Sequence, residues 1–116
     1  MEYGDLIIVT RGKLKGMIGI YDDDDWSRGP EVIFYIGPLL TLCYSVRAKS
    51  CRKATYEDIT QRHHWLWLNK ISRMVRSASD FDPDEVFRAT LEWTMLESWL
   101  GDRRHQALRE MTDLPA

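Results

Sequence analysis

The sequence predicts an α+β fold, in which a small β-barrel of four or five short strands is followed by two to three packed α-helices. Up to residue 54, short apolar runs alternate with glycine and proline turns, which is typical of small barrels. From residue 55 onward the apolar period becomes helical. The chain has 116 residues, 44% of them hydrophobic, which is enough to bury one core. We therefore expect a barrel over 1–54 and a helical segment over 55–116, packed together as one structural unit.

The predicted strands are short and follow one another closely. Residues 6–10 form a β-branched apolar run, and 15–21 form a second strand that contains two glycines. Residues 31–36 and 40–46 alternate between apolar and other side chains, as half-buried strands do. Residues 47–53 are a basic turn with a short closing strand. This spacing predicts a barrel that uses about 50 residues.

The glycine pattern of the first two strands resembles a known motif. The pattern consists of Gly4, Asp5, Val9, Gly12, Lys15, Gly16, Gly19 and Ile20. In spacing and residue type it is similar to the KOW motif, which opens the SH3-like barrels of transcription elongation factors and of some large-subunit ribosomal proteins. The resemblance covers residues 4–21 and implies an SH3-like barrel. Such barrels bind RNA, proteins or neither, so the resemblance does not assign a function.

Two helix starts stand out in the second half of the chain. Thr55 and Asp58 have the spacing of a capping box, and we expect an amphipathic helix to follow with a basic outer face. On a helical wheel that starts at residue 56, the outer face carries Arg62, Asn69, Arg73 and Arg76, with Trp65 and Leu66 beside it. The apolar face carries Tyr56, Trp67, Ile71, Met74 and Ala78, widened by Leu68 and Val75.

The second helix start is the stronger one. Asp82 is placed to cap a helix whose first residue is Pro83. Residues 83–100 are apolar almost all round, which predicts a helix that is packed on more than one side. We expect Gly101 to end this helix and Asp102 to cap a short last helix that extends to Met111.

Charge is segregated along the chain. The net charge of −2 divides into −3 for residues 1–44, +6 for 45–76 and −5 for 77–116. Blocks of opposite sign either pair within the fold or face a partner. No apolar run reaches the roughly 18 residues of a membrane span, and the first residues lack a signal-peptide pattern. We therefore expect a cytoplasmic protein, with Cys43 and Cys51 as free thiols.

The sequence predicts no metal site, no cofactor and no enzymatic activity. The residues that could bind a metal are Cys43, Cys51, His63, His64 and His105, and their spacing matches no zinc pattern. The four consecutive aspartates lack the glycine and the distal glutamate of an EF-hand loop. No motif places a nucleophile beside a base, and no phosphate-binding glycine loop is present.

The first hypothesis for function is a non-enzymatic protein-binding module, most specifically an immunity or antitoxin protein that neutralises a toxin, for example a nuclease. The expected partner-binding residues are Asp22, Asp23, Asp24, Asp25 and Trp26. An acidic loop of this kind can imitate nucleic-acid phosphates on a basic toxin surface, with a tryptophan as anchor. The alternative interpretation is a solvated loop without a partner.

The second hypothesis is a KOW-type RNA- or ribosome-associated protein that uses the basic segment 47–76. Its nucleic-acid-binding residues would be Arg47, Lys49, Arg52, Lys53, Arg62, Trp65, Arg73 and Arg76. Such cations can contact phosphates while a tryptophan stacks on a base. The pI of about 5.9 argues against a dedicated RNA binder, and the same cations could instead pair with the acidic last third. Either hypothesis allows a monomer, or a homodimer through Trp65, Trp93 or Trp99.

Overall fold

A computed structural model of the chain describes residues 2–22, 31–37 and 39–112. The fold combines one antiparallel sheet with a helical part, so the predicted α+β class is confirmed. Of the predicted acidic binding loop, only Asp22 is among the described residues, while Asp23, Asp24, Asp25 and Trp26 lie outside them.

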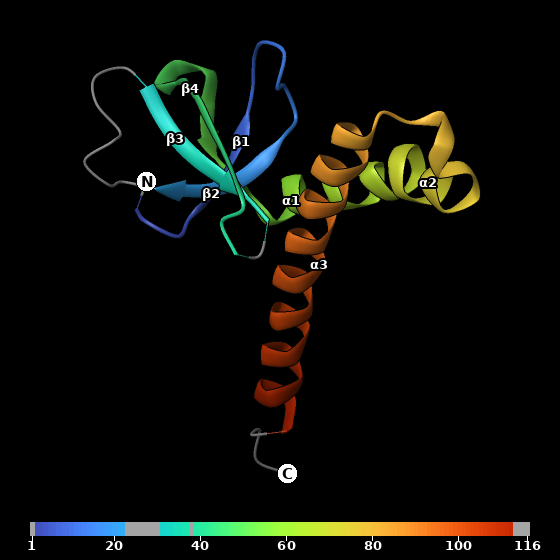
Figure 1. The fold of residues 1–116 in the computed structure, drawn as a ribbon. Helices are drawn as coiled ribbons and strands as arrows, with labels where there is room; N and C mark the ends of the chain where they lie inside the picture. The colour runs from blue at the N-terminus through green and yellow to red at the C-terminus, as the bar shows by residue number, and fades with distance from the viewer. Residues whose placement is uncertain (1, 23–30, 38, 113–116) are drawn as a thin grey trace.

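Five strands make up the sheet, which Figure 1 shows beside the helices. The strands are β1 (Leu6–Val9), β2 (Ile18–Asp22), β3 (Glu31–Ile36), β4 (Leu42–Arg47) and β5 (Cys51–Lys53). Their order is β4-β3-β2-β1-β5, and every neighbouring pair is antiparallel. A short 3₁₀ helix, η1 (Ala48–Ser50), joins β4 to β5. In the described residues the sheet is open, with β4 and β5 as its edges, so the short antiparallel strands are confirmed while closure into the predicted barrel is not seen.

The two faces of the sheet bury different side chains, because successive residues of a strand point to opposite faces. One face has its own core, formed by Ile7, Val9, Met17, Val32, Phe34 and Ile36. Gly19 lies on this face beneath Phe34, and a Cβ placed on it would come within 2.3 Å of the Phe34 ring. The alternation predicted for 31–36 is therefore confirmed, and Gly19 marks a close approach of the backbone to an aromatic ring.

The helices cover the other face of the sheet (Figure 1). This second core joins side chains of β1 and β2 to those of two long helices, namely Leu6, Ile18, Ile59, Leu66, Met95, Leu96 and Leu100. The helices therefore pack on the sheet through residues that lie some 40 to 90 positions away in the sequence, as the change of period at residue 55 predicts. No helix in the described part of the chain combines the length and the apolar character that spanning a membrane requires.

The first helical stretch consists of α1 (Tyr56–Leu66), the π-helical turn η2 (Trp67–Ile71) and α2 (Ser72–Ser77). The predicted capping box is present: Thr55 Oγ1 accepts from the Asp58 amide at 3.1 Å, and Asp58 accepts from the Thr55 amide at 2.8 Å. The π-helical turn was not predicted. It contains one extra residue per turn, which rotates all later side chains by about 100°.

The π-helical turn overturns part of the predicted helical wheel. Leu66, expected beside the basic outer face, is 1% exposed, whereas Leu68 and Val75, assigned to the apolar face, are 53% and 78% exposed. Arg62 also leaves the predicted outer face, because its side chain is only 16% exposed and pairs with a carboxylate of the next helix. Arg62 and Leu66 precede the π-helical turn, but the predicted apolar face rested mainly on residues within and after that turn. A single wheel over 56–78 therefore assigns Arg62 and Leu66 to the wrong face.

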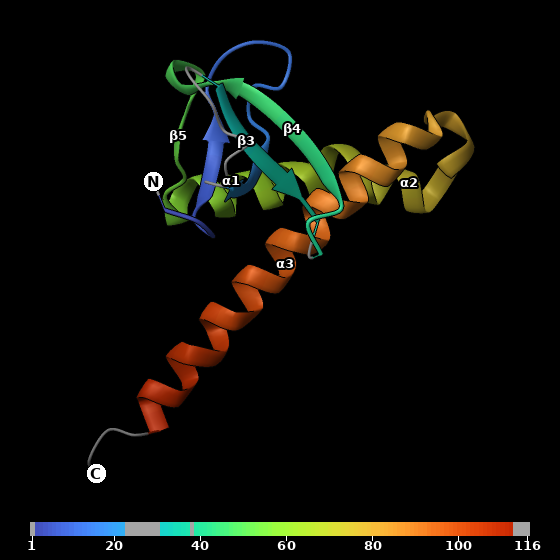
Figure 2. The same cartoon turned by 60° about the vertical axis from the view of Figure 1, so that its left-hand side comes forward.

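The second helix, α3 (Pro83–Thr112), follows the 3₁₀ turn η3 (Ala78–Asp80). It begins as predicted, with Asp82 Oδ1 accepting from the Asp84 amide at 2.8 Å. The predicted end at Gly101 and the separate last helix are wrong, because α3 runs through Gly101 with a helical backbone. Glycine in a helix costs about 1 kcal/mol, which weakens a helix without ending it. Figure 2 shows the C-terminal half of α3 extending away from the sheet.

Candidate functional site

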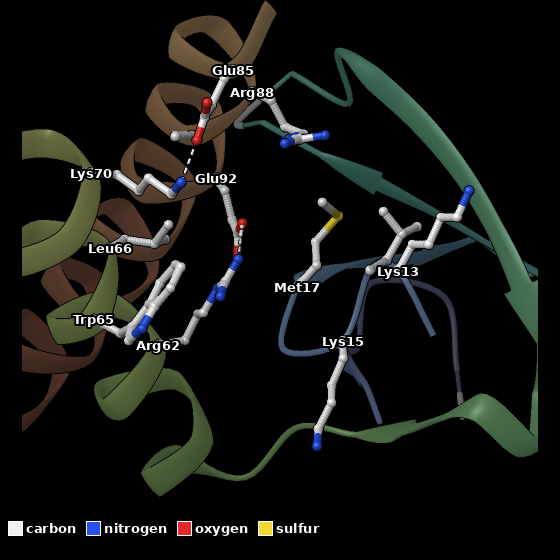
Figure 3. Close-up of a pocket in the computed structure, with 12 residues that line it drawn as sticks. Lys13, Lys15, Met17, Arg62, Trp65, Leu66, Lys70, Glu85, Arg88 and Glu92 are labelled. Carbon is white, nitrogen blue, oxygen red and sulfur yellow. Dashed lines mark hydrogen bonds and ion pairs between the residues drawn. The ribbon is translucent and has the colours of Figure 1, made fainter. Parts of the chain in front are cut away.

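A cationic pocket lies where the turn between β1 and β2 meets the helices (Figure 3). Its cavity volume is about 190 Å³. One wall comes from the turn at Lys13, Lys15 and Met17, and the other walls come from α1, η2 and the first turns of α3. Because these elements are far apart in the sequence, only the folded chain assembles the pocket.

The floor of the pocket is an ion pair between α1 and α3. Arg62 donates two hydrogen bonds to Glu92, from Nε to Oε2 at 2.7 Å and from Nη2 to Oε1 at 3.0 Å. Glu92 Oε2 also accepts from the Ile18 amide of β2 at 3.1 Å. Glu92 is 1% exposed, and it is the one buried charged residue in the described part of the chain. A buried carboxylate needs such partners, so Glu92 ties α1, α3 and the sheet to one another.

Glycine at position 16 lets the guanidinium approach the turn. Gly16 has a φ of +91°, which side chains rarely adopt, and a Cβ there would lie 3.2 Å from Arg62 Nη1. Gly16, which was predicted as part of a strand over 15–21, thus belongs to the turn before β2. Its missing side chain leaves room for one edge of the Arg62 guanidinium.

Trp65 and Lys70 form the helical wall of the pocket. The Arg62 guanidinium carbon lies 4.5 Å from the centroid of the Trp65 ring, and Lys70 Nζ lies 6.0 Å from the same centroid. Lys70 is ion-paired with Glu85 of α3. Trp65 remains 42% exposed, so its ring presents an uncovered edge to solvent. Stacking against two cations holds the ring in place while leaving it accessible.

The pocket carries an excess of positive charge. Its lining contains Lys13, Lys15, Arg62, Lys70 and Arg88 against two carboxylates, Glu85 and Glu92. Each carboxylate is paired with one cation. Lys13, Lys15 and Arg88 make no ion pair with any residue that the structure describes. Unpaired cations that line a concave site favour an anionic ligand, so these side chains are suited to binding one.

The structure scatters most of the residues predicted to bind nucleic acid. Of that set it brings only Arg62 and Trp65 together, in the cationic pocket. Arg47 and Lys49 line a separate pocket of about 410 Å³ at the end of β4. Arg73 and Arg76 are exposed on α2, which does not line the cationic pocket.

The remaining two predicted cations are held by acidic neighbours. Arg52 donates to both oxygens of Asp58, at 2.6 and 3.1 Å, and Lys53 lies 3.7 Å from Asp5. The hydrogen bonds from Arg52, together with that from the Thr55 amide, hold the pKa of Asp58 well below its usual range. These pairs agree with the alternative in which the basic segment is neutralised within the fold. Arg52 and Lys53 find their partners within the first 58 residues, whereas Arg62 and Lys70 pair with Glu92 and Glu85 of the acidic last third.

The described residues considered for a metal site do not form a cluster of three or more ligands. Cys43 is exposed on β4, and Cys51 is partly buried on β5, where burial raises the pKa of its thiol. His63 stacks on Trp93 with ring centroids 5.5 Å apart and shares a hydrogen bond with Glu97. No group of three or more potential metal ligands occurs in the described part of the chain.

The tryptophans considered for a dimer interface differ in their surroundings. Trp65 is partly exposed in the pocket, whereas Trp93 packs between His63 and Trp67, with centroid distances of 5.5 and 6.0 Å. Trp99 lies 6.1 Å from Tyr56 and 4.9 Å from the Arg103 guanidinium. Trp93 and Trp99 therefore contribute to the packing of α3 against the first helical stretch, which leaves Trp65 as the best placed of these three tryptophans to meet a partner.

Sequence reasoning missed most of the pocket. Lys13 and Glu92 were not among the predicted site residues, and Lys15 entered only through the pattern that resembles the KOW motif. One available signal was the presence of Glu92 among apolar residues, because a carboxylate on a buried face requires a cationic partner. The partner itself could not be found from spacing, since Arg62 is 30 residues away.

Comparison of this chain with models of protein families, with curated proteins and with solved structures finds no match.

Proposed function

We propose that this chain is a non-enzymatic module that binds another protein, and that the cationic pocket is the centre of its contact surface. The observation that carries the proposal is Trp65, a partly exposed tryptophan on the wall of a concave site, with the Arg62 guanidinium 4.5 Å and Lys70 Nζ 6.0 Å from its ring centroid. Tryptophan and arginine are enriched among the residues that dominate binding energy at protein interfaces. The unpaired cations of the pocket would meet an acidic group of the partner.

Exposed apolar side chains elsewhere on the helices also favour a protein partner. Trp67 is 44% exposed, Leu68 53% and Phe87 50%. They do not line the cationic pocket, and Phe87 borders a separate apolar pocket at the start of α3. Exposed aromatic and aliphatic groups of this size are typical of protein contacts.

Binding of RNA is the less favoured alternative. An RNA backbone requires a continuous path of unpaired cations, and affinity rises with the number of phosphates contacted. Here Arg52, Lys53, Arg62 and Lys70 are all engaged by carboxylates, and the chain as a whole is acidic at −2. The unpaired cations of the pocket are confined to one depression, which suits a single anionic group better than a strand.

The finer descriptions made from the sequence belong to this proposal. An SH3-like, KOW-type barrel over 1–54 is supported by five short antiparallel strands, the last of which returns to pair with the first. The immunity or antitoxin role stays a prediction, because most of the acidic loop on which it depends lies outside the described residues. The chain would then offer two binding surfaces of opposite charge, the cationic pocket and the acidic loop. The charge of the partner's contact surface would show which of the two it binds.

Affinity capture with matched variants tests the proposal. Trp65→Ala and Arg88→Ala change the pocket without removing either member of the Arg62–Glu92 pair. Trp65→Ala also removes the ring that lies against the Arg62 guanidinium, whereas Arg88→Ala removes only a cation that makes no ion pair in the described part of the chain. Arg47→Ala and Arg73→Ala are the controls, because they remove exposed cations outside the pocket. We expect the parent chain and both controls to retain the same partner, and both pocket variants to lose it. The partner is then purified and its affinity for each variant is measured by calorimetry.

Two results would contradict the proposal. One is a partner that all four variants bind with the same affinity. The other is capture of nucleic acid, seen as nuclease-sensitive absorbance at 260 nm, together with an affinity that falls steeply as salt is raised. The second result would favour the hypothesis that the pocket binds RNA.

A further inference from the structure

We propose that the cationic pocket seats a phosphate monoester, the doubly charged group that a phosphorylated side chain presents. The inference rests on the proposed function, because it names the chemistry of the group that the partner would insert. It uses three properties of the pocket, namely an unused edge of Arg62, the placement of Arg88 and the cavity volume.

Arg62 has a free donor that faces the turn. Its Nε and Nη2 are occupied by Glu92, while Nη1 makes no hydrogen bond with any residue that the structure describes. Nη1 instead lies beside Gly16, where the missing side chain leaves space. The bidentate pair fixes the plane of the guanidinium, so the remaining donor is held in position before a ligand arrives.

Arg88 completes the cationic side of the seat. Figure 3 shows its side chain projecting from α3 toward the wall that carries Met17, across the cavity from Arg62. Lys13 and Lys15 extend from the turn toward the outside of the pocket. Two arginines can therefore contact an anion inside the cavity, while the lysines contribute charge at its rim. Planar guanidinium groups match the oxygens of a phosphate better than ammonium groups do.

The charge balance favours a dianion over a carboxylate. Five cations against two carboxylates leave the pocket lining at +3. A phosphate monoester carries a charge of about −1.5 to −2 at neutral pH, whereas a carboxylate or a phosphodiester carries −1. Lys13, Lys15 and Arg88, the three cations without an ion pair in the described part of the chain, attract each additional negative charge of the ligand. The attraction is stronger because the site is partly shielded from solvent.

The cavity has the size of one such group. Its volume is about 190 Å³. That space accommodates a tetrahedral phosphate and its linking atom, but it is smaller than the pockets of about 300–1,000 Å³ that hold whole nucleotides or drug-sized ligands. Trp65 then lies at the edge of the site, where it would contact the residue that carries the phosphate.

Calorimetry on the full chain tests the inference without any protein partner. The probes are inorganic phosphate, O-phospho-L-serine, acetate and an oligouridylate of about four nucleotides, at pH 7.5 and at ionic strength kept constant with sodium chloride. We expect phosphate and phosphoserine to bind at least about tenfold more tightly than acetate. Arg88→Ala should weaken both by about tenfold, because it removes a charge-assisted contact, whereas Arg73→Ala on α2 should leave both unchanged.

Three results would overturn the inference. They are phosphate binding no tighter than acetate binding, phosphate binding that is equal in the Arg88→Ala and parent chains, and an oligouridylate that binds more tightly than phosphoserine. Circular dichroism of Arg88→Ala confirms that a loss of binding is not a loss of folding. Because these titrations need no partner, phosphate binding with no protein capture would contradict the proposed function alone.

Discussion

Replacing Glu92 with leucine tests how the pocket is held together. The change removes a carboxylate that is 1% exposed and accepts three hydrogen bonds, one from Ile18 N and two from Arg62. It leaves the Arg62 guanidinium, whose side chain is only 16% exposed, without an acceptor. It also leaves the Ile18 amide without its partner at the start of β2.

The expected loss of stability is large. Removing one partner of a buried ion pair costs about 3–5 kcal/mol, because the other charge stays buried and uncompensated. A domain of this size has a total stability of about 5–15 kcal/mol, so the Glu92→Leu chain should be marginally folded. Arg62→Met should cost a similar amount, since it leaves the carboxylate unpaired. The double variant should be more stable than either single variant, because apolar side chains replace both charges.

Urea unfolding followed by tryptophan fluorescence and circular dichroism measures these values. The four chains of the double-mutant cycle give a coupling free energy between Arg62 and Glu92, and we expect at least about 2 kcal/mol. Glu92→Gln is the matched control, since its amide oxygen can still accept from the Ile18 amide while the charge is lost. It should fall between the parent chain and Glu92→Leu.

Additive losses in the cycle would refute this reasoning. So would a Glu92→Leu chain that loses less than about 1 kcal/mol, since that is the range of an exposed pair. Either result would mean that Glu92 does not join the sheet to the two helices, and that other interactions hold the walls of the pocket together.

Further predictions concern two glycines and two caps. Gly19→Ala should destabilise the fold by at least about 3 kcal/mol, because its Cβ would lie 2.3 Å from the Phe34 ring and 2.8 Å from the Tyr35 carbonyl oxygen. Gly101→Ala, whose Cβ would have nothing within 4 Å, should stabilise the fold by about 0.5–1 kcal/mol. Thermal unfolding measures both changes. Asp58→Asn should lower stability at pH 7 by about 1 kcal/mol and flatten the acid limb of the stability curve. The reason is that Arg52 lowers the pKa of Asp58 from its ordinary 3.8. The ionised carboxylate therefore contributes to stability above about pH 4, and this contribution is lost as the pH falls toward the lower pKa that Asp58 has in the folded chain. Urea unfolding between pH 2 and 7 follows the loss, and an acid limb that is unchanged in Asp58→Asn would contradict it. Asp82→Ala should cost about 1 kcal/mol through the lost cap of α3, with Asp80→Ala as a control that should cost less than about 0.5 kcal/mol in the same urea assay.

Local patterns in the sequence predicted the elements well where one short-range interaction decides the structure. The capping box at Thr55, the start of α3 after Asp82 and the alternation within β3 all depend on residues within a few positions of one another. Such contacts are encoded by spacing, so they can be read before the fold is known. The α+β class followed from the same patterns.

The errors arise where tertiary contacts override local preference. Gly101 does not end α3, because its backbone stays helical and the helix tolerates the lost propensity. The π-helical turn at Trp67–Ile71 shifts the period within what the sequence presents as one amphipathic helix. Arg62 was placed on the outer face for this reason and because its partner, Glu92, belongs to another helix. The pocket depends on the π-helical turn and on the contact between Arg62 and Glu92, so the residues that line it could not be predicted from the sequence.

The central claim is that a protein partner contacts the cationic pocket. Amide chemical-shift mapping of the labelled chain on addition of the captured partner tests it most directly, because it reports every part of the surface at once. We predict the largest changes at Lys13–Met17, around Trp65 and near Arg88, with small changes at Cys43 on β4 and at Arg73 on α2. Changes centred instead on Asp22 and the residues that follow it, with the pocket amides unmoved, would contradict the claim and favour the acidic loop.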